Sequence, residues 1–146
     1  MKHSHNYLSL FMTFCVVVFI SNVAYAQRPT RSAINLGLSV KWANMNIGAD
    51  SPEEYGNYYA WGETEPKSTY TIDNSITYGV EMGDISGNPE YDAATANWGS
   101  TWKMPTKYDL SELLNNCTFE WTNINGIEGY KVVGPNGRNI FLPATG

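Results

Sequence analysis

The chain has 146 residues, 42% of them apolar and 14% aromatic, which is enough for one domain with a substantial core. Nine Lys and Arg residues stand against fourteen Asp and Glu residues, so the formal net charge is −5. An acidic chain without a basic patch argues against binding to nucleic acid or to an anionic membrane surface.

The first 26 residues have the three parts of a secretory signal peptide. Lys2 and two neighbouring histidines form a basic or basic-capable start, residues 7–20 are mainly apolar, and residues 24–26 (AYA) have the small-x-small pattern of a cleavage site. A membrane-spanning helix needs roughly 20 apolar residues, more than this run offers. We therefore expect residues 1–26 to be removed. The mature chain then begins near Gln27 and acts after export, in the periplasm, at the outer surface or secreted, without a membrane span.

Cleavage would remove chemical groups that many enzymes use. Both histidines and Cys15 lie in the signal peptide, which leaves Cys117 alone and no imidazole in the mature chain. An internal disulfide is then excluded, as are Ser–His–Asp, Cys–His and histidine-based zinc chemistry. We expect Cys117 to be a small buried hydrophobe rather than a nucleophile. Glycosidase chemistry needs only two carboxylates and stays open; the candidates are Glu53, Glu54, Glu63, Glu65, Glu90 and Asp92.

The first half of the mature chain reads as short strands and a long loop. Residues 27–35 are interpreted as a flexible lead-in to a domain spanning 36–146. Apolar and polar residues alternate over 38–42, which predicts a half-buried strand, and residues 58–61 are a second candidate strand. Residues 63–88 are polar and dotted with glycine, which is typical of a long surface loop in which ligand-binding residues often lie.

Two short helices are predicted from their capping residues. Asn88 as N-cap and Pro89 as the first helical residue predict a helix that stops at Gly99. Thr106, with Asp109 three residues later, predicts a capping box at the start of a second helix. Apolar side chains then recur at helical spacing and should face the core: Leu110, Leu113, Leu114 and Cys117.

After the second helix the pattern changes to that of an antiparallel meander. Residues 119–121 alternate as in a strand, and Asn125-Gly126 is a tight-turn signal. Residues 130–133 and 139–142 flank the turn sequence GPNG at 134–137, which predicts a hairpin. Together these signals predict an α+β domain with an antiparallel sheet and two short helices.

Several linked motifs carry a resemblance to a known family. They are LGLSVKWA at 36–43, EYGNYYAWGE at 54–63, WGSTWKMPT at 98–106, GYKVVGPNG at 129–137 and IFLPA at 140–144. In this order they resemble the Fibrobacter succinogenes major paralogous domain family. Membership implies a C-type-lectin-like fold and an exported protein of a Bacteroides-type bacterium, but no defined biochemical activity.

The resemblance has departures that bear on function. Family members continue past residue 144 into further aromatic strands, so we expect the domain to be incomplete at its C-terminal end, with residues 140–142 at an unpaired sheet edge. Calcium-dependent lectins use Glu-Pro-Asn or Gln-Pro-Asp and a later Trp-Asn-Asp. Here Glu65-Pro66-Lys67 offers a cation, and Asn88-Pro89-Glu90 is explained by helix capping. We therefore expect no obligatory metal or cofactor. The WKMPT segment is similar to formylglycine-generating enzymes, but the later cysteines of that reaction are missing.

Aromatic side chains are the remaining candidates for binding. Six of them cluster on and after the second predicted strand, and we select Tyr59, Trp61, Tyr70 and Tyr78 as candidate ligand-binding residues. Core packing is the stronger interpretation for the five tryptophans: Trp42, Trp61, Trp98, Trp102 and Trp121. The sequence thus favours an exported, noncatalytic binding module for a surface glycan or protein. A structural module of a cell-surface complex is the first alternative, and a carboxylate-based glycosidase is the second.

Overall fold

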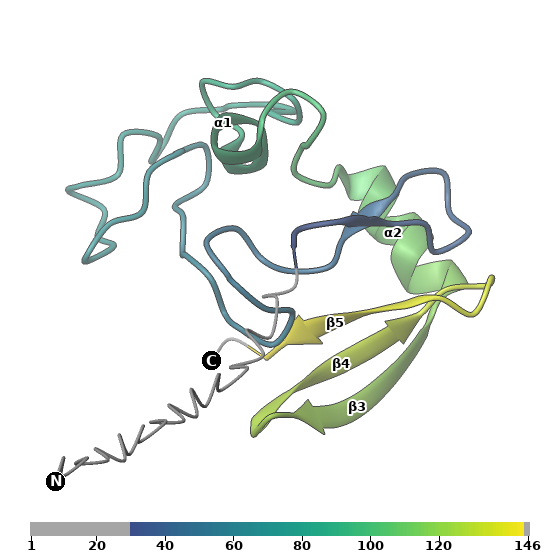
Figure 1. Cartoon of the computed structure of the whole chain (residues 1–146). Helices are drawn as coiled ribbons and strands as arrows, with labels where there is room; N and C mark the ends of the chain where they lie inside the picture. Colours follow the sequence, from purple (N-terminus) through teal and green to yellow (C-terminus); the bar gives the residue numbers. More distant parts are fainter. Residues whose placement is uncertain (1–29, 145–146) are drawn as a thin grey trace, which may run out of the picture.

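The protein is a small mixed α/β structure with two antiparallel sheets and two helices (Figure 1). The computed structural model describes residues 30–144, so the predicted signal peptide lies outside the described residues. The elements are β1 (Ala33–Ile34), β2 (Trp42–Ala43), α1 (Ala93–Trp98), α2 (Lys107–Asn116), β3 (Thr118–Ile124), β4 (Ile127–Val133) and β5 (Asn139–Pro143). The predicted antiparallel sheet and two short helices are confirmed.

The larger sheet is the predicted meander, with strand order β3-β4-β5. Asn125 and Gly126 join β3 to β4 with φ angles of 51° and 86°. Positive φ at both central residues is the geometry that an Asn-Gly hairpin turn favours. Trp121 pairs with Tyr130, and Val132 pairs with Ile140, so these four side chains lie on one face. Among the described residues, β5 has a sheet neighbour on one side only, as expected for residues 140–142.

The hydrophobic core lies where this sheet meets α2 and the N-terminal segment. Leu36, Leu113, Val132 and Ile140 form its buried centre. Each such side chain stabilises the fold by about 1.5–3 kcal/mol through its removal from water. Six partly buried side chains surround them: Ile34, Leu38, Trp42, Cys117, Phe119 and Leu142. Cys117 therefore packs as the predicted hydrophobe, and burial raises the pKa of its thiol, with Glu112 adding a smaller effect.

Helix α2 begins as predicted but faces the core with a different stripe. Thr106 and Asp109 form the reciprocal capping box. Leu113 is 2% exposed, whereas Leu110 and Leu114 are 43% and 65% exposed, so the prediction that both face the core is wrong. The buried residues of α2 are Asp109 and Leu113, so the inward side of the helix includes the carboxylate of the capping box. This carboxylate accepts the backbone N–H and the hydroxyl of Thr106, which allows it to be buried.

The N-terminal segment forms a smaller sheet than predicted. Ala33 pairs with Ala43, and Ile34 pairs with Trp42, so part of the predicted flexible lead-in is a strand. Of the predicted strand 38–42, only Trp42 is in a strand. Ser39 donates its backbone N–H to both carboxylate oxygens of Glu112, at 3.0 and 3.2 Å. A side chain of α2 therefore takes the place of a neighbouring strand.

Residues 58–61 form no strand, which corrects the second strand prediction. Gly56 and Gly62, with φ angles of 69° and 75°, turn the chain on both sides of this short segment. Tyr58 and Trp61 are both more than half exposed, so neither has the packing that stabilises a strand.

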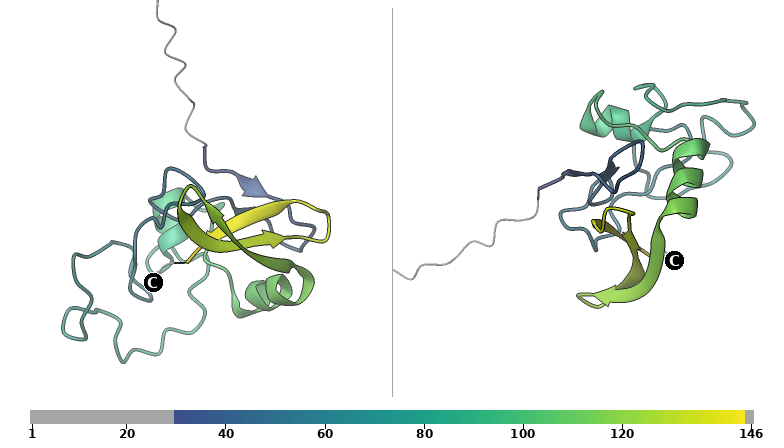
Figure 2. Two further views of the ribbon diagram at one scale, coloured as in Figure 1. Left: turned by 90° about the horizontal axis from the view of Figure 1, so that it is seen from below. Right: turned by 90° about the vertical axis from the view of Figure 1, so that its right-hand side faces the viewer.

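The loop 63–88 contains no helix or strand, as predicted, and extends away from the sheet (Figures 1 and 2). Polar side chains organise it. The buried Glu63 accepts the N–H of Ile76 at 3.1 Å and forms an ion pair with Lys67. Asn97 of α1 donates its side-chain amide to the carbonyl of Thr64 at 3.0 Å, which fastens the loop to the helix.

Helix α1 ends at Gly99 as predicted but begins later than predicted. Its N-cap is Asp92, whereas Asn88 accepts the N–H of Glu90 with its side chain and those of Tyr91 and Asp92 with its carbonyl. Asn88 and Pro89 therefore form the turn before the helix. The carboxylate of Asp92 is the stronger cap because it accepts several backbone donors at once.

Candidate functional site

A cavity of about 620 Å³ lies between the small sheet, α1 and the segment that follows α1. Pockets that bind small ligands usually measure roughly 300–1,000 Å³. Its apolar wall contains three tryptophans and two methionines: Trp42, Met45, Trp98, Trp102 and Met104. The three tryptophans belong to the motifs 36–43 and 98–106. Two smaller cavities lie elsewhere in the described part of the chain.

Short-range structure fixes the three tryptophans. Trp42 lies on β2 opposite Ile34. Trp98 is the last residue of α1, and a turn at Gly99 brings Trp102 back towards it, with the Trp102 N–H donating to the Gly99 carbonyl at 3.0 Å. The Trp98 and Trp102 rings meet edge to face at 5.1 Å and 72°. The two indoles therefore hold each other in a fixed orientation.

Trp42 has a hydrogen-bonding group without a partner. Its indole Nε1 is buried, and no acceptor lies within hydrogen-bonding distance of it among the described residues. A buried donor without an acceptor costs about 1–3 kcal/mol. The nitrogen itself is closed to solvent, so an oxygen of a ligand in the adjoining cavity would accept this hydrogen bond only after a neighbouring side chain moves aside.

Asp92 fixes the backbone of the cavity wall through hydrogen bonds. Its side chain is fully buried, and its two oxygens accept the N–H groups of Ala94, Thr95, Gly87 and Met104 at 2.7–3.0 Å. Three of these four donors belong to cavity-lining residues: Gly87, Ala94 and Met104. Burial alone would raise the pKa of Asp92, but the hydrogen bonds from Gly87, Met104 and Thr95 outweigh it and hold the pKa below its ordinary value.

The charged part of the wall has two cations and one anion. Lys41, Lys103 and Asp109 all line the cavity. Asp109 accepts the backbone N–H and hydroxyl of Thr106 and lies 3.3 Å from the Lys103 ammonium, so its charge is already compensated. The Thr106 backbone hydrogen bond is the main cause of the lowered pKa of Asp109. Arg31 is not among the lining residues, but its guanidinium lies 4.8 Å from the centre of the Trp98 ring.

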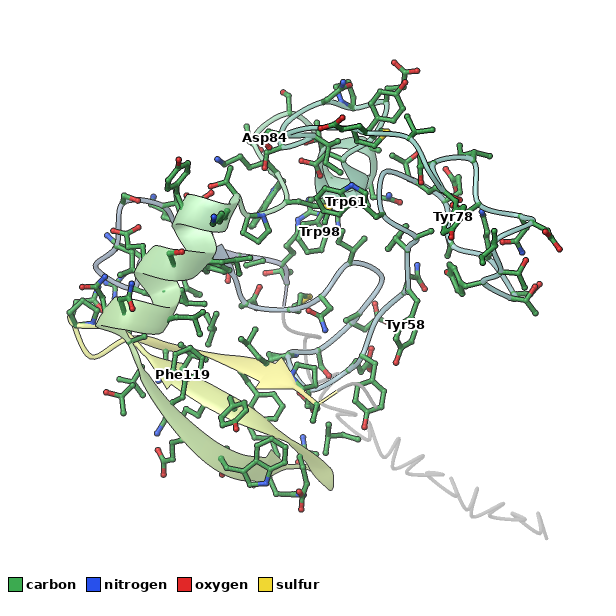
Figure 3. All side chains as sticks on the ribbon, turned by 180° about the vertical axis from the view of Figure 1, so that it is seen from behind. Tyr58, Trp61, Tyr78, Asp84, Trp98 and Phe119 are labelled. Carbon is green, nitrogen blue, oxygen red and sulfur yellow. The ribbon has the colours of Figure 1, made fainter. Side chains whose placement is uncertain are left out.

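The four binding residues predicted from the sequence lie away from this cavity. Tyr70 and Tyr78 are brought together in a second cavity of about 390 Å³, within the loop 63–88. Trp61 is 58% exposed and lies in a third cavity, of about 300 Å³, with Tyr108. Tyr59 lines none of these three cavities. In Figure 3 Tyr78 lies well apart from Trp98, at the outer loop.

Tyr70 has a structural hydrogen-bonding role in the loop. Its hydroxyl accepts the backbone N–H of Lys67 at 2.9 Å and donates to the carbonyl of Tyr58. The first bond lies within the loop, and the second fastens the loop to the segment before it. The ring of Tyr78, which is 66% exposed, is the more accessible of the two aromatic faces in that cavity.

The prediction that the five tryptophans pack in the core is right for Trp42, which packs against the core cluster. Trp121 is 52% exposed and Trp61 also faces water, so neither belongs to the core. Trp42, Trp98 and Trp102 are partly buried, and all three line the cavity. The available signal was their position in two short motifs rich in Gly, Ser, Thr and Lys, because such small and polar neighbours do not close a core around an indole.

Four of the six candidate carboxylates accept hydrogen bonds that hold the fold. Glu53 accepts the side-chain amide of Asn125 at 2.7 Å, which lowers its pKa, and Glu54 accepts the N–H of Asp50 at 2.7 Å. Glu63 and Asp92 have the contacts given above. No group of three or more His, Cys, Asp or Glu side chains able to hold a metal ion occurs within residues 30–144.

Comparison with known proteins found no matching family model, no matching curated protein and no matching solved structure. In the part of the chain that the structure describes, neither helix is long and apolar enough to cross a bilayer.

Proposed function

We propose that this chain is an exported, noncatalytic recognition module that holds a surface glycan or protein ligand in the cavity formed by Trp42, Trp98 and Trp102. The observation that carries the proposal is the buried indole N–H of Trp42, which has no acceptor beside a cavity of ligand size. Two fixed indole faces on the opposite wall would supply contact area without a loss of side-chain freedom.

Binding is favoured over catalysis by the state of the carboxylates. Asp109 is the one carboxylate among the residues that line the cavity, and its charge is compensated by Thr106 and Lys103. Glycoside hydrolysis uses two carboxylates that face each other across the bond to be cleaved. Glu63 and Asp92 are both buried and bonded to backbone N–H groups, which gives them structural roles.

The proposal is tested with two matched tryptophan variants. Trp42→Phe removes the buried N–H, and Trp121→Phe makes the same change at an exposed tryptophan of the larger sheet. Ligands found by glycan array and by pull-down with the mature domain should lose at least tenfold in affinity for Trp42→Phe and be unchanged for Trp121→Phe. If the parent, Trp42→Phe and Trp121→Phe bound every ligand with equal affinity, the cavity would be refuted as the binding site.

Family membership, fold and export belong to the same proposal. The five linked motifs support membership in the major paralogous domain family with its C-type-lectin-like fold, and the pattern of residues 1–26 supports export. An experimental structure would test the fold. N-terminal sequencing of the secreted product should begin at Gln27, and a product retaining Met1 would contradict export by cleavage.

A second candidate function is assembly in a cell-surface complex, and an uncovered aromatic pair on the larger sheet favours it. Trp121 and Tyr130 lie edge to face, 4.9 Å apart, on the same sheet face as the core residue Val132 but beyond the part that the core covers, and both are at least 44% exposed. Exposed aromatic side chains of this kind are enriched at protein interfaces. Concentration-dependent mass in sedimentation equilibrium, abolished by Trp121→Ser, would favour assembly. A monomer at all concentrations would count against self-assembly.

A further inference from the structure

We infer that the ligand of the tryptophan cavity is an acidic glycan, in which a sugar ring contacts the indoles and a carboxylate faces Lys41 and Arg31. This inference rests on the proposed function, because it names the class of ligand for the same cavity.

Positive charge gathers at this cavity although the chain is acidic. The formal net charge is −5, yet the cavity is lined by Lys41 and Lys103 against Asp109 alone, and Arg31 lies over Trp98 and Trp102. Neither Arg31 nor Lys41 forms an ion pair within residues 30–144. Asp92 lies behind the wall, fully buried and bonded to four N–H groups. Lys41 in the wall, with Arg31 against the two indoles, would therefore attract an anionic ligand.

The remaining polar groups suit a sugar. Ser100 and Thr101 line the cavity and are exposed, and their hydroxyls make no hydrogen bond within the described part of the chain. A hydroxyl both donates and accepts, as do the hydroxyls of a sugar. The Trp42 N–H is a donor for a ring or hydroxyl oxygen. Aromatic rings supply flat apolar contact for the C–H face of the sugar ring.

The shape of the site disfavours an extended acidic peptide. Peptides are usually bound along an open sheet edge, in a helix-binding groove or on a polyproline-binding surface. This cavity is bounded instead by a two-residue strand, a short helix and a turn, so it encloses a compact group rather than a strand of chain.

The test uses three probes with the mature domain in 50 mM salt, measured by calorimetry and by the indole N–H signals in ¹⁵N NMR spectra. The probes are trigalacturonate, its neutral methyl ester and a glutamate hexapeptide. We expect trigalacturonate to bind about tenfold or more tightly than the ester, and the difference to shrink in 0.5 M salt because both cations are exposed. Its binding should shift the Trp42 signal.

Variants of single cations test whether Arg31 and Lys41 attract the ligand. Arg31→Gln and Lys41→Gln should each weaken trigalacturonate binding about two- to fivefold, as expected for one exposed charge. Arg31→Lys keeps the charge and should bind nearly as the parent does, which separates charge from packing on Trp98. Arg138→Gln, a cation on the β4–β5 hairpin, is the matched control and should have no effect.

Each contrary outcome is distinguishable. Equal binding of acid and ester would overturn the charge argument, while a shifted Trp42 signal would leave the proposed function standing. Binding of the glutamate peptide with no binding of either sugar would overturn the glycan class and leave a protein ligand. If no probe moves the Trp42 signal, the acidic-glycan inference fails. If the array and pull-down ligands also leave it unmoved, the proposed function fails with it.

Discussion

Replacing Asp92 by Asn tests whether one buried carboxylate holds the wall of the tryptophan cavity in place. The two side chains have nearly the same shape, but the amide has one acceptor oxygen and one NH₂ group. Asp92 now accepts four backbone N–H groups, two on each oxygen. In the variant, two of these donors would face another donor.

The expected loss of stability follows from these two donors. A buried backbone N–H left without an acceptor costs about 1–3 kcal/mol, so two of them cost about 2–6 kcal/mol. Domains of this size are stable by roughly 5–15 kcal/mol, so the variant would lose a large fraction of its stability. Its melting temperature should fall by roughly 10–25 °C.

Urea unfolding followed by tryptophan fluorescence measures this loss, with Asp84→Asn as the control. Asp84 is exposed and accepts a single backbone hydrogen bond, from Ser86 at 3.0 Å, so its variant should lose less than about 1 kcal/mol. If Asp92→Asn were as stable as Asp84→Asn, the reasoning that Asp92 fixes the backbone of the cavity wall would be refuted.

The same comparison has a defined pH dependence. The pKa of Asp92 is lower in the folded chain than its ordinary value, so its ionised form contributes stability above the unfolded-state pKa of about 3.9. That contribution is lost as pH falls through the folded-state pKa. The stability difference between the parent and Asp92→Asn should therefore be constant near neutral pH and narrow below about pH 4. A difference that grows on acidification would contradict this sign.

The remaining predictions concern the core and the capping of α2, and all are read from urea midpoints. Leu113→Ala should cost about 2–5 kcal/mol because the side chain is buried, whereas Leu114→Ala should stay within about 0.5 kcal/mol; similar losses would contradict the observed orientation of α2. Thr106→Ala should cost about 1 kcal/mol by removing the N-cap, and an unchanged midpoint would count against the capping box. Gly134→Ala should destabilise by roughly 1–3 kcal/mol or more, because its Cβ would lie 2.0 Å from the Leu36 carbonyl oxygen, and a neutral effect would disprove that close approach.

The elements that could be predicted from the sequence are those specified by neighbouring residues. The Asn125-Gly126 turn, the hairpin around residues 134–137 and the Thr106–Asp109 capping box each have a local signature, and all three are present. In these cases the side chain or the allowed φ angle acts within a few residues. Distant parts of the chain do not compete with it.

The predictions that failed depended on contacts between distant residues. The strand expected at 38–42 is replaced by a turn because Glu112, more than seventy positions later, binds Ser39. Asp92 rather than Asn88 caps α1 because its second oxygen also binds Gly87 and Met104. Periodicity and local capping rules contain no information about such partners.

The candidate site also depends on contacts between residues far apart in the sequence. Exposed aromatic residues of the loop 63–88 were the natural choice from composition, and two of them do share a cavity. The larger cavity depends on Trp42 of β2 lying beside Trp98 and Trp102, which are separated from it by more than fifty residues. A sequence shows that these residues are tryptophans, but it does not show which face of each indole stays uncovered.

The most direct test of the account is the indole N–H signal of Trp42, assigned with the Trp42→Phe variant, during titration with trigalacturonate. We predict that this signal moves to the position of a hydrogen-bonded indole as the ligand binds, while the signal of the exposed Trp121 of the larger sheet stays fixed. Saturating binding that moves Trp121 and leaves Trp42 unchanged would contradict the cavity as the recognition site.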